Sequence, residues 1–228
     1  MNTPVISRLV VKDLLLWRKM IMIFLAVGLA SIAIVSGLYG RVPRLVFYNL
    51  GFTLLIAPTT TLGIVLLMQT NVFEKAKSTQ LFVMSLPVTR TDFKIAKLLV
   101  NLPIFTLAWL ATTAVAFYFM FGLRVLPTGA IPFMTMVFLG IYVAYLGILC
   151  VSLLSQSLGV TIIGILFFEV LTSAYLWVIV FLKPIGDHIL SFDIVWNSTV
   201  LTILTLQIIA GIALVAAAVC LQGKTTTD

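Results

Sequence analysis

Few residues in this sequence have the types and spacing that enzymatic chemistry requires. The HExxH, GxSxG and GxGxxG patterns are absent, and the single histidine, His188, stands in a polar loop where such a residue is more often solvated than catalytic. Gly223-Lys224-Thr225 resembles the end of a phosphate-binding loop, but Ala218 stands where that loop needs its first glycine, and an apolar run replaces the preceding strand. We therefore expect no catalytic residue, no metal site and no cofactor in this chain.

Glu169 is the one acidic residue that lies well inside an apolar run. A carboxylate in hydrocarbon costs about 2.5 to 3.5 kcal/mol on insertion scales, so Glu169 should face protein or a wet cavity, or be protonated. Thr172 and Ser173 follow within about one helical turn and extend a polar stripe on that face. Two interpretations stay open: a neutral glutamate that is hydrogen-bonded to a neighbouring helix, or a group on a transport path.

A second apolar run is interrupted by Pro58, Thr59 and Thr60. Proline removes a backbone donor, so this sequence predicts a kink whose freed carbonyl groups accept hydrogen bonds from the threonine hydroxyls. We include Pro58, Thr59 and Thr60 with Glu169 among the candidate residues of a substrate path.

The composition that surrounds these residues is that of a membrane protein. Hydrophobic residues make up 62% of the chain and charged residues 9%, and the mean hydropathy is +1.22. A spanning helix needs roughly 20 apolar residues, so a chain of 228 residues has room for about six. The net charge of +7 comes from basic residues at the ends of apolar runs, a pattern of membrane orientation rather than of nucleic-acid binding.

We predict an all-α polytopic protein with one membrane domain over residues 1–228. An amphipathic helix at 1–19 should lie along the membrane surface, with apolar Ile6 and Leu9 opposite charged Lys12 and Asp13. The apolar runs place spans near residues 20–39, 45–70, 98–122, 133–154, 158–182 and 199–221. The fourth and fifth spans should form a tight hairpin. The loop 183–198 is rich in apolar residues, and we expect it to dip back into the membrane interface.

Small residues recur on one face of two predicted spans. They are Ala26, Ala30, Ala33 and Gly37 in the first span, and Gly140, Ala144 and Gly147 in the fourth. Such faces let helix backbones approach closely. Packing within the chain and contact between two copies remain alternatives for both rows.

The segment 71–97 is the long charged passage of the chain, and it must lie in water. Its first part predicts a short helix over 73–85, which Pro87 ends because proline cannot donate and disfavours a helical residue before it. The next helix should start at Thr89 or Thr91, since either hydroxyl can cap it, and Thr89 with Asp92 three positions later resembles a capping box.

Orientation follows from the basic residues on the two sides of six spans. One side carries ten: Arg8, Lys12, Arg18, Lys19, Lys75, Lys77, Arg90, Lys94, Lys97 and Lys224. The other side carries four: Arg41, Arg44, Arg124 and Lys183. This asymmetry predicts that both termini and the segment 71–97 are cytoplasmic.

Three pieces of this segment form a recognisable pattern: Phe73-Glu74-Lys75, then Ser85-Leu86-Pro87-Val88-Thr89-Arg90, then Lys97. The pattern resembles the cytoplasmic segment of ABC-2 type transporter permeases. In that family an acidic residue after the second span leads through a short helix to a similar Leu-Pro turn, and a lysine opens the third span. The surface helix, the six spans and the chain length agree with the family as well.

The resemblance implies the membrane subunit of an ATP-driven exporter in the cytoplasmic membrane of a prokaryote. Two permease copies, or this chain and a related permease, would pair with two separate ATPase subunits that hold ATP and Mg, so the chain itself would not be an enzyme. The helix 73–85 would be the coupling helix that docks on the ATPase. The residues expected to form or position it are Phe73, Glu74, Lys75, Lys77, Leu81, Phe82, Val83, Met84, Pro87 and Arg90.

A rival interpretation from another class uses Glu169 directly. A secondary transporter or channel could employ this carboxylate for proton or ion coupling, although the chain shows no internal repeat of the kind that such transporters often have. Co-purification of an ATPase favours the exporter, whereas transport that runs on a proton gradient without ATP favours the rival.

Overall fold

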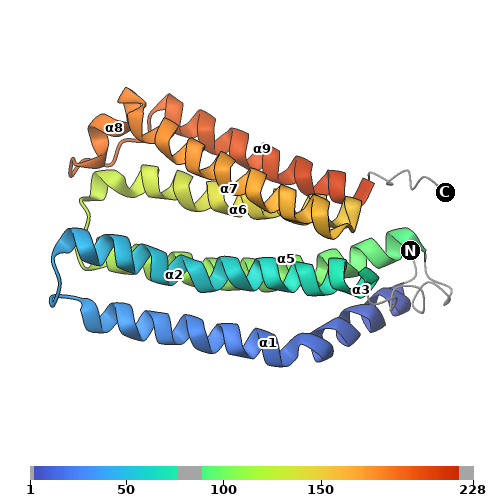
Figure 1. The fold of residues 1–228 in the computed structure, drawn as a ribbon. Coiled ribbons are helices and arrows are strands. Elements are labelled where there is room, and N and C mark those ends of the chain that lie inside the picture. The colour runs from blue at the N-terminus through green and yellow to red at the C-terminus, as the bar shows by residue number, and fades with distance from the viewer. Residues whose placement is uncertain (1–2, 77–88, 221–228) are drawn as a thin grey trace.

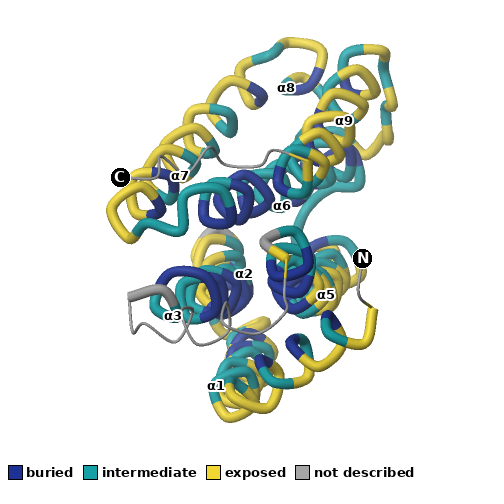
Figure 2. Tube along the Cα trace, turned by 90° about the vertical axis from the view of Figure 1, so that its right-hand side faces the viewer, coloured by how far each residue is buried: buried dark blue, intermediate teal, exposed yellow. Residues whose placement is uncertain are grey.

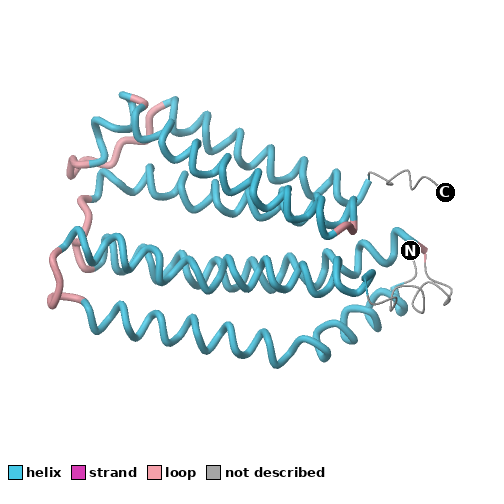
Figure 3. The backbone as a smooth tube through the Cα atoms, viewed as in Figure 1, coloured by secondary structure: helices cyan, strands magenta, loops and turns pink. Residues whose placement is uncertain are grey.

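A computed structural model describes residues 3–76 and 89–220, and within these ranges the protein is helical and has no strand (Figure 3). Six of the described helices are long and apolar enough to cross a membrane. The predicted all-α fold class is thereby confirmed, and the protein has the architecture of a multi-pass membrane protein.

The membrane-crossing helices lie close to the ranges expected from the sequence. The described elements are α1 (Thr3–Leu38), α2 (Arg44–Leu67) with a π-helical turn (Met68–Val72), α3 (Phe73–Ala76), α5 (Arg90–Phe117) with a second π-helical turn (Tyr118–Gly122), a 3-10 turn (Thr128–Ala130), α6 (Ile131–Ser155), α7 (Leu158–Phe181), α8 (Lys183–Ile189) and α9 (Ser198–Cys220). The predicted hairpin between α6 and α7 is present, and Gln156 closes α6 in the left-handed region with φ of 47°.

The long helices form two layers (Figure 1). One layer contains α1, α2 and α5, which pack on one another, and the other contains α6, with α7 and α9 packed against it. Phe105 of α5 and Tyr145 of α6 stack where the layers meet, with ring centroids 3.5 Å apart. Buried residues gather on α2, α5 and α6, whereas α1, α7 and α9 leave much of their apolar surface exposed, as a lipid-facing helix would (Figure 2).

The ends of the helices alternate as six spans require. The start of α1, α3, the start of α5, the α6–α7 turn and the end of α9 lie at one end of the bundle, here called the α3 end (Figure 1). The connections 39–43 and 123–130 and the helix α8 lie at the opposite end, here called the α8 end. At the α8 end, the amide of Gly129 donates to the carbonyl of Ser191 at 3.0 Å and joins the connection before α6 to the one after α8.

The N-terminal segment differs from its prediction. Residues 4–19 are not a separate helix, because α1 continues without a break from Thr3 to Leu38 and changes direction along its length (Figure 1). Ile6 and Leu9 pack with Phe93 and Ala96 of α5. The spacing that puts Ile6 and Leu9 on one face also puts Asp13 there, so this carboxylate is buried and does not belong to a water-facing surface.

The predicted start of the third span is confirmed at Thr89. Its side chain accepts a hydrogen bond from the amide of Asp92 at 3.1 Å, and its hydroxyl donates to the Asp92 carboxylate at 2.8 Å. Of the predicted coupling helix 73–85, the structure describes Phe73–Ala76, which is helical. The remaining residues of that helix and Pro87 lie outside the described residues.

The two rows of small residues have different surroundings. Gly140 and Gly147 pack within the chain: added β-carbons would lie 2.8 Å from the Tyr175 ring and 2.2 Å from the Phe168 ring, respectively. In contrast, Gly37 has no atom within 4 Å of such a position, and Ala26 and Ala30 are exposed. Packing within the chain therefore accounts for the row on α6 but not for the row on α1.

Candidate functional site

Four charged side chains meet at the α3 end of the bundle. They are Lys12 and Asp13 of α1, Glu74 of α3 and Lys97 of α5, and they are called the ion cluster below. The ammonium group of Lys97 contacts Oε2 of Glu74 and lies 2.6 Å from Oδ2 of Asp13. Lys12 lies 2.5 Å from Oε1 of Glu74 and 3.1 Å from Oδ1 of Asp13.

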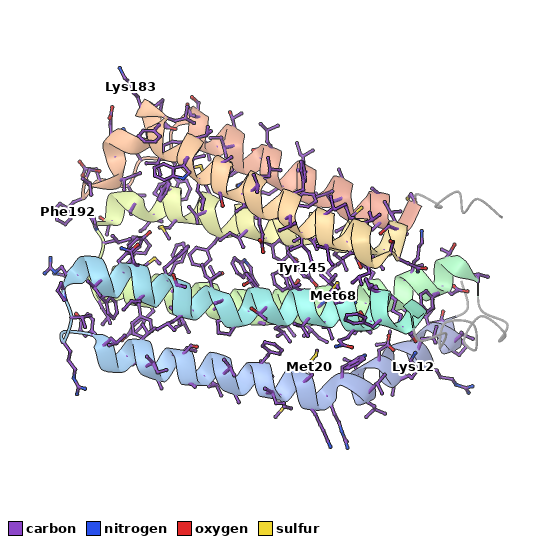
Figure 4. The ribbon with its side chains drawn as sticks, viewed as in Figure 1. Lys12, Met20, Met68, Tyr145, Lys183 and Phe192 are labelled. Carbon is purple, nitrogen blue, oxygen red and sulfur yellow. The ribbon has the colours of Figure 1, made fainter. Side chains whose placement is uncertain are left out.

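The ion cluster is buried except for Lys12. The side chains of Lys97 and Asp13 are each 2% exposed and that of Glu74 is 9% exposed, whereas Lys12 is 37% exposed. Figure 4 shows Lys12 on α1 at the α3 end. Two positive and two negative groups balance each other, so the cluster is neutral as a unit. Its members come from three helices, and α3 is thereby tied to both α1 and α5.

The electrostatics favour the ionised form of Glu74. Burial alone would raise the pKa of this carboxyl, but the positive charges of Lys97 and Lys12 and their hydrogen bonds lower it, and the net result is a pKa below its ordinary value of 4.5. The paired state of Glu74 is therefore the state that the folded protein prefers near neutral pH.

A chain of neutral hydrogen bonds continues from the ion cluster into the bundle. The side-chain amide of Asn101 donates to the Lys97 carbonyl and to the hydroxyl of Thr70, both at 2.9 Å. The neighbouring Asn71 donates to the hydroxyl of Ser152 on α6 at 3.2 Å. Thr70 and Asn71 belong to the π-helical turn that ends the second span, and such turns occur frequently at functional sites. This turn therefore connects the ion cluster with the α6 layer.

The ion cluster places one of the predicted coupling residues in an unexpected position. Glu74 was expected to meet the ATPase, but its carboxylate is turned inward onto Lys97 and Lys12. Phe73 is half-buried next to it. Arg90 starts α5, and Lys75 lies in α3. Lys77, Leu81, Phe82, Val83, Met84 and Pro87 lie outside the described residues.

Sequence reasoning missed the partners of Glu74. Lys12 and Asp13 were assigned to the water-facing side of a surface helix, and Lys97 was noted only as the opening of a span. The available signal was the position of acidic and basic residues near one end of three helices that six-span topology brings together. Once helix packing buries these carboxylates, each needs an ammonium partner, because an unpaired buried charge is strongly destabilising.

A second group of polar residues surrounds a cavity of about 410 Å³ that lies between the two layers and opens at the surface of the chain. It is called the central pocket below, and its lining consists of Thr60, Thr61, Ile64, Phe105, Ile141, Ala144, Tyr145, Ile148, Phe168, Glu169, Thr172 and Ser173. These residues come from α2, α5, α6 and α7. Figure 4 shows Tyr145 between the layers, at the level of the pocket.

The central pocket gathers most of the candidate path residues. Glu169, Thr172, Ser173 and Thr60 all line it, and Thr61 joins them from α2. Glu169 is exposed and stands near the middle of α7, which has 24 residues, so it lies far from either end of its span. The pocket therefore combines a carboxylate and hydroxyl groups with apolar and aromatic walls near the centre of the membrane-crossing region.

The other two candidates lie elsewhere. Pro58 is buried inside α2, which continues through it, and Thr59 points to α5, where its hydroxyl lies 2.6 Å from that of Thr112. Thr60 donates to the carbonyls of Ile56 and Ala57 at 3.1 and 3.2 Å, as expected for a hydroxyl next to a proline-containing turn. Thr59 thus ties α2 to α5 and takes no part in the lining of the pocket.

The fold and these two sites define a six-helix membrane protein with an ion cluster at one end and a pocket between its layers. Comparison of the chain with family models, with curated proteins and with solved structures gives no match.

Proposed function

We propose that this chain is the membrane-spanning permease subunit of an ATP-driven exporter of the ABC-2 type. Two copies, or one copy and a related permease, would work with two separate ATPase subunits that bind ATP and Mg. The membrane would be the cytoplasmic membrane of a prokaryote, with the α3 end in the cytoplasm, as the distribution of basic residues indicates.

The observation that carries the proposal is the attachment of α3 to two spanning helices through the ion cluster. A chain that is driven by a separate ATPase must receive the movement through a contact at one membrane face. A segment that is fixed by buried ion pairs moves with the helices to which it is tied, because separating buried opposite charges is costly. Movement imposed on the segment after α3 would therefore reach α1 and α5 directly.

The sequence of this segment supplies a surface for a partner. Phe82, Val83 and Met84 stand between the second and third spans, among charged residues, and would anchor in an apolar groove of the ATPase. Lys75 and Lys77 would speed the encounter with the ATPase and help to fix the position of the coupling helix on it. The conformation of residues 77–88 is outside the described part of the chain, so this assignment is made from the sequence.

Co-purification tests the proposal. Phe82→Asp and Met84→Asp should leave the protein inserted and folded but remove the ATPase from the detergent-purified complex. Phe192→Asp is the matched control, because Phe192 is 82% exposed at the α8 end and the same substitution there should leave the ATPase bound. Retention of the ATPase at wild-type stoichiometry in both variants of the coupling segment would remove this assignment.

The position of Glu169 in the central pocket supports a second candidate, a secondary transporter or channel with this residue as the coupling group. The two candidates differ in their energy source. In proteoliposomes that contain only this chain, transport driven by a proton gradient and abolished in Glu169→Gln would favour the second candidate. Transport that requires the ATPase and ATP would favour the exporter.

A further inference from the structure

The central pocket contains one acidic side chain and no basic one. Glu169 is its single ionisable carboxylate, and no lysine, arginine or histidine belongs to its lining. Among the described residues, Glu169 has no ion-pair or hydrogen-bond partner, whereas both carboxylates of the ion cluster, Asp13 and Glu74, are paired with lysines. The pocket therefore offers a negative group that the described part of the chain leaves uncompensated.

The remainder of the lining is suited to an apolar body that carries a positive charge. Phe105, Tyr145 and Phe168 present aromatic rings, whose faces attract cations. Thr61 and Ser173 supply hydroxyl oxygens, and aliphatic side chains cover the rest. A bare divalent metal ion would need several oxygen ligands at short range, and the described residues contain no group of three or more metal-binding side chains.

We propose that the central pocket binds a hydrophobic monovalent cation, an ammonium or phosphonium group on an apolar body, with Glu169 as its counter-ion. The pairing would offset the cost of placing a carboxylate near the middle of a spanning helix. This assignment rests on the proposed transport function, since it makes the pocket the place where the permease receives its cargo. It adds the substrate class, which the fold alone does not specify.

Binding of two ions of the same shape and opposite charge tests which sign of charge the pocket prefers. The full chain is purified, placed in phosphatidylcholine nanodiscs and equilibrated with tetraphenylphosphonium or with tetraphenylborate. Binding to empty nanodiscs is subtracted, because the interfacial dipole potential makes the two ions partition unequally into lipid. The remaining saturable binding of the phosphonium ion should be stronger than that of the borate ion by about tenfold or more, because only the former gains from Glu169. Equal affinities of the wild-type chain for both ions would overturn the proposal, and this comparison needs no variant.

Variants then locate the binding. Glu169→Gln should weaken phosphonium binding by about tenfold or more, whereas Asp187→Asn, which removes a negative charge at the α8 end, should leave it unchanged. Ala144→Leu should weaken binding by filling the pocket. Unchanged binding in Glu169→Gln would overturn the assignment. Displacement of the phosphonium ion by phosphatidylethanolamine in the nanodisc would overturn it in favour of a lipid amine.

The outcome separates this inference from the proposed function. The binding measurement contains no ATPase, so a failure to bind the phosphonium ion leaves the co-purification test of the exporter unaffected. Conversely, if no ATPase co-purifies with the wild-type chain and the purified chain still binds the phosphonium ion, the exporter is rejected and the pocket assignment stays in place.

Discussion

The ammonium nitrogen of Lys97 lies 2.6 Å from a carboxylate oxygen of Asp13, and both side chains are only 2% exposed. The residues are 84 positions apart in the sequence, so the contact fixes the start of the third span against the first. Lys97 also contacts Glu74, and its ammonium lies 4.9 Å from the centre of the Phe93 ring. Lys97 is therefore the central member of the ion cluster, and its removal should have the largest effect.

Lys97→Met should destabilise the folded protein by about 3 to 5 kcal/mol, because it leaves the two buried carboxylates of Asp13 and Glu74 to share the partly exposed Lys12. Lys19→Met, at an exposed position of the same helix as Asp13, should change stability little. Thermal unfolding of the detergent-purified variants, followed by the loss of the monodisperse peak in gel filtration, measures both effects. Equal unfolding temperatures in the two variants would show that the buried pairs do not stabilise the bundle.

The stability of the protein should fall at acidic pH through Glu74. The folded-state pKa of this carboxyl is lowered from 4.5, so its contribution is present above that value and is lost as the pH decreases through the folded-state pKa. The unfolding temperature of the wild type should therefore decline below about pH 4.5, and the decline should be smaller in Glu74→Gln, which cannot be protonated. The same decline in both proteins would assign the acid sensitivity to other groups.

Gly129 should be the glycine least tolerant of a side chain at the α8 end. A β-carbon there would lie 2.4 Å from the carbonyl oxygen of His188 and 2.5 Å from that of Ser191, and backbone atoms cannot rotate away as a side chain can. Gly129→Ala should cost about 1 to 3 kcal/mol. Gly28→Ala in α1, where no atom lies within 4 Å, should be neutral or stabilise by up to about 1 kcal/mol. Thermal unfolding of the two variants compares these effects, and a larger loss in Gly28→Ala would contradict the geometry.

The sequence prediction and the structure agree on features that depend on a single helix. The apolar runs place four of the six long helices to within a few residues at both ends, and Thr89 caps its helix as the local pattern predicts. The polar stripe of Glu169, Thr172 and Ser173 also follows from the period of a single helix, and all three residues line the same pocket. These features depend on local geometry, which the sequence determines directly.

The sequence prediction and the structure differ where the position of a side chain depends on the packing of two helices. The sequence assigns Asp13 to the charged face of a helix. Its burial depends on the packing of α1 on α5, which the periodicity of α1 alone does not specify. Thr59 and Thr60 are neighbours in the sequence, yet a helical step of about 100° sends the first to Thr112 and the second to the central pocket. Pairing between helices, rather than the character of each helix, is the information that the structure adds.

The direction of the bundle in the membrane can be measured with single cysteines. We expect an impermeant reagent applied to intact cells to label a cysteine at position 187, in α8, but not one at position 226. The reason is the excess of basic residues at the α3 end, where the start of α1 and the end of α9 lie (Figure 1). Labelling at 226 but not at 187 would invert the orientation and place the segment after α3 out of reach of a cytoplasmic ATPase.

Glu74→Gln should separate binding of the ATPase from transmission of its movement. The docking residues of the coupling segment are unchanged in this variant, so the ATPase should remain bound, whereas the charge contact between α3 and Lys97 is lost. Spin labels at Leu110 of α5 and Val170 of α7, which are 59% and 69% exposed, report the distance between the two layers by double electron–electron resonance. ATP should change this distance in the wild-type complex and in the Lys19→Met control, and it should change it much less in Glu74→Gln. A full ATP-dependent change in Glu74→Gln with the ATPase bound would show that the movement reaches α5 without the ion cluster.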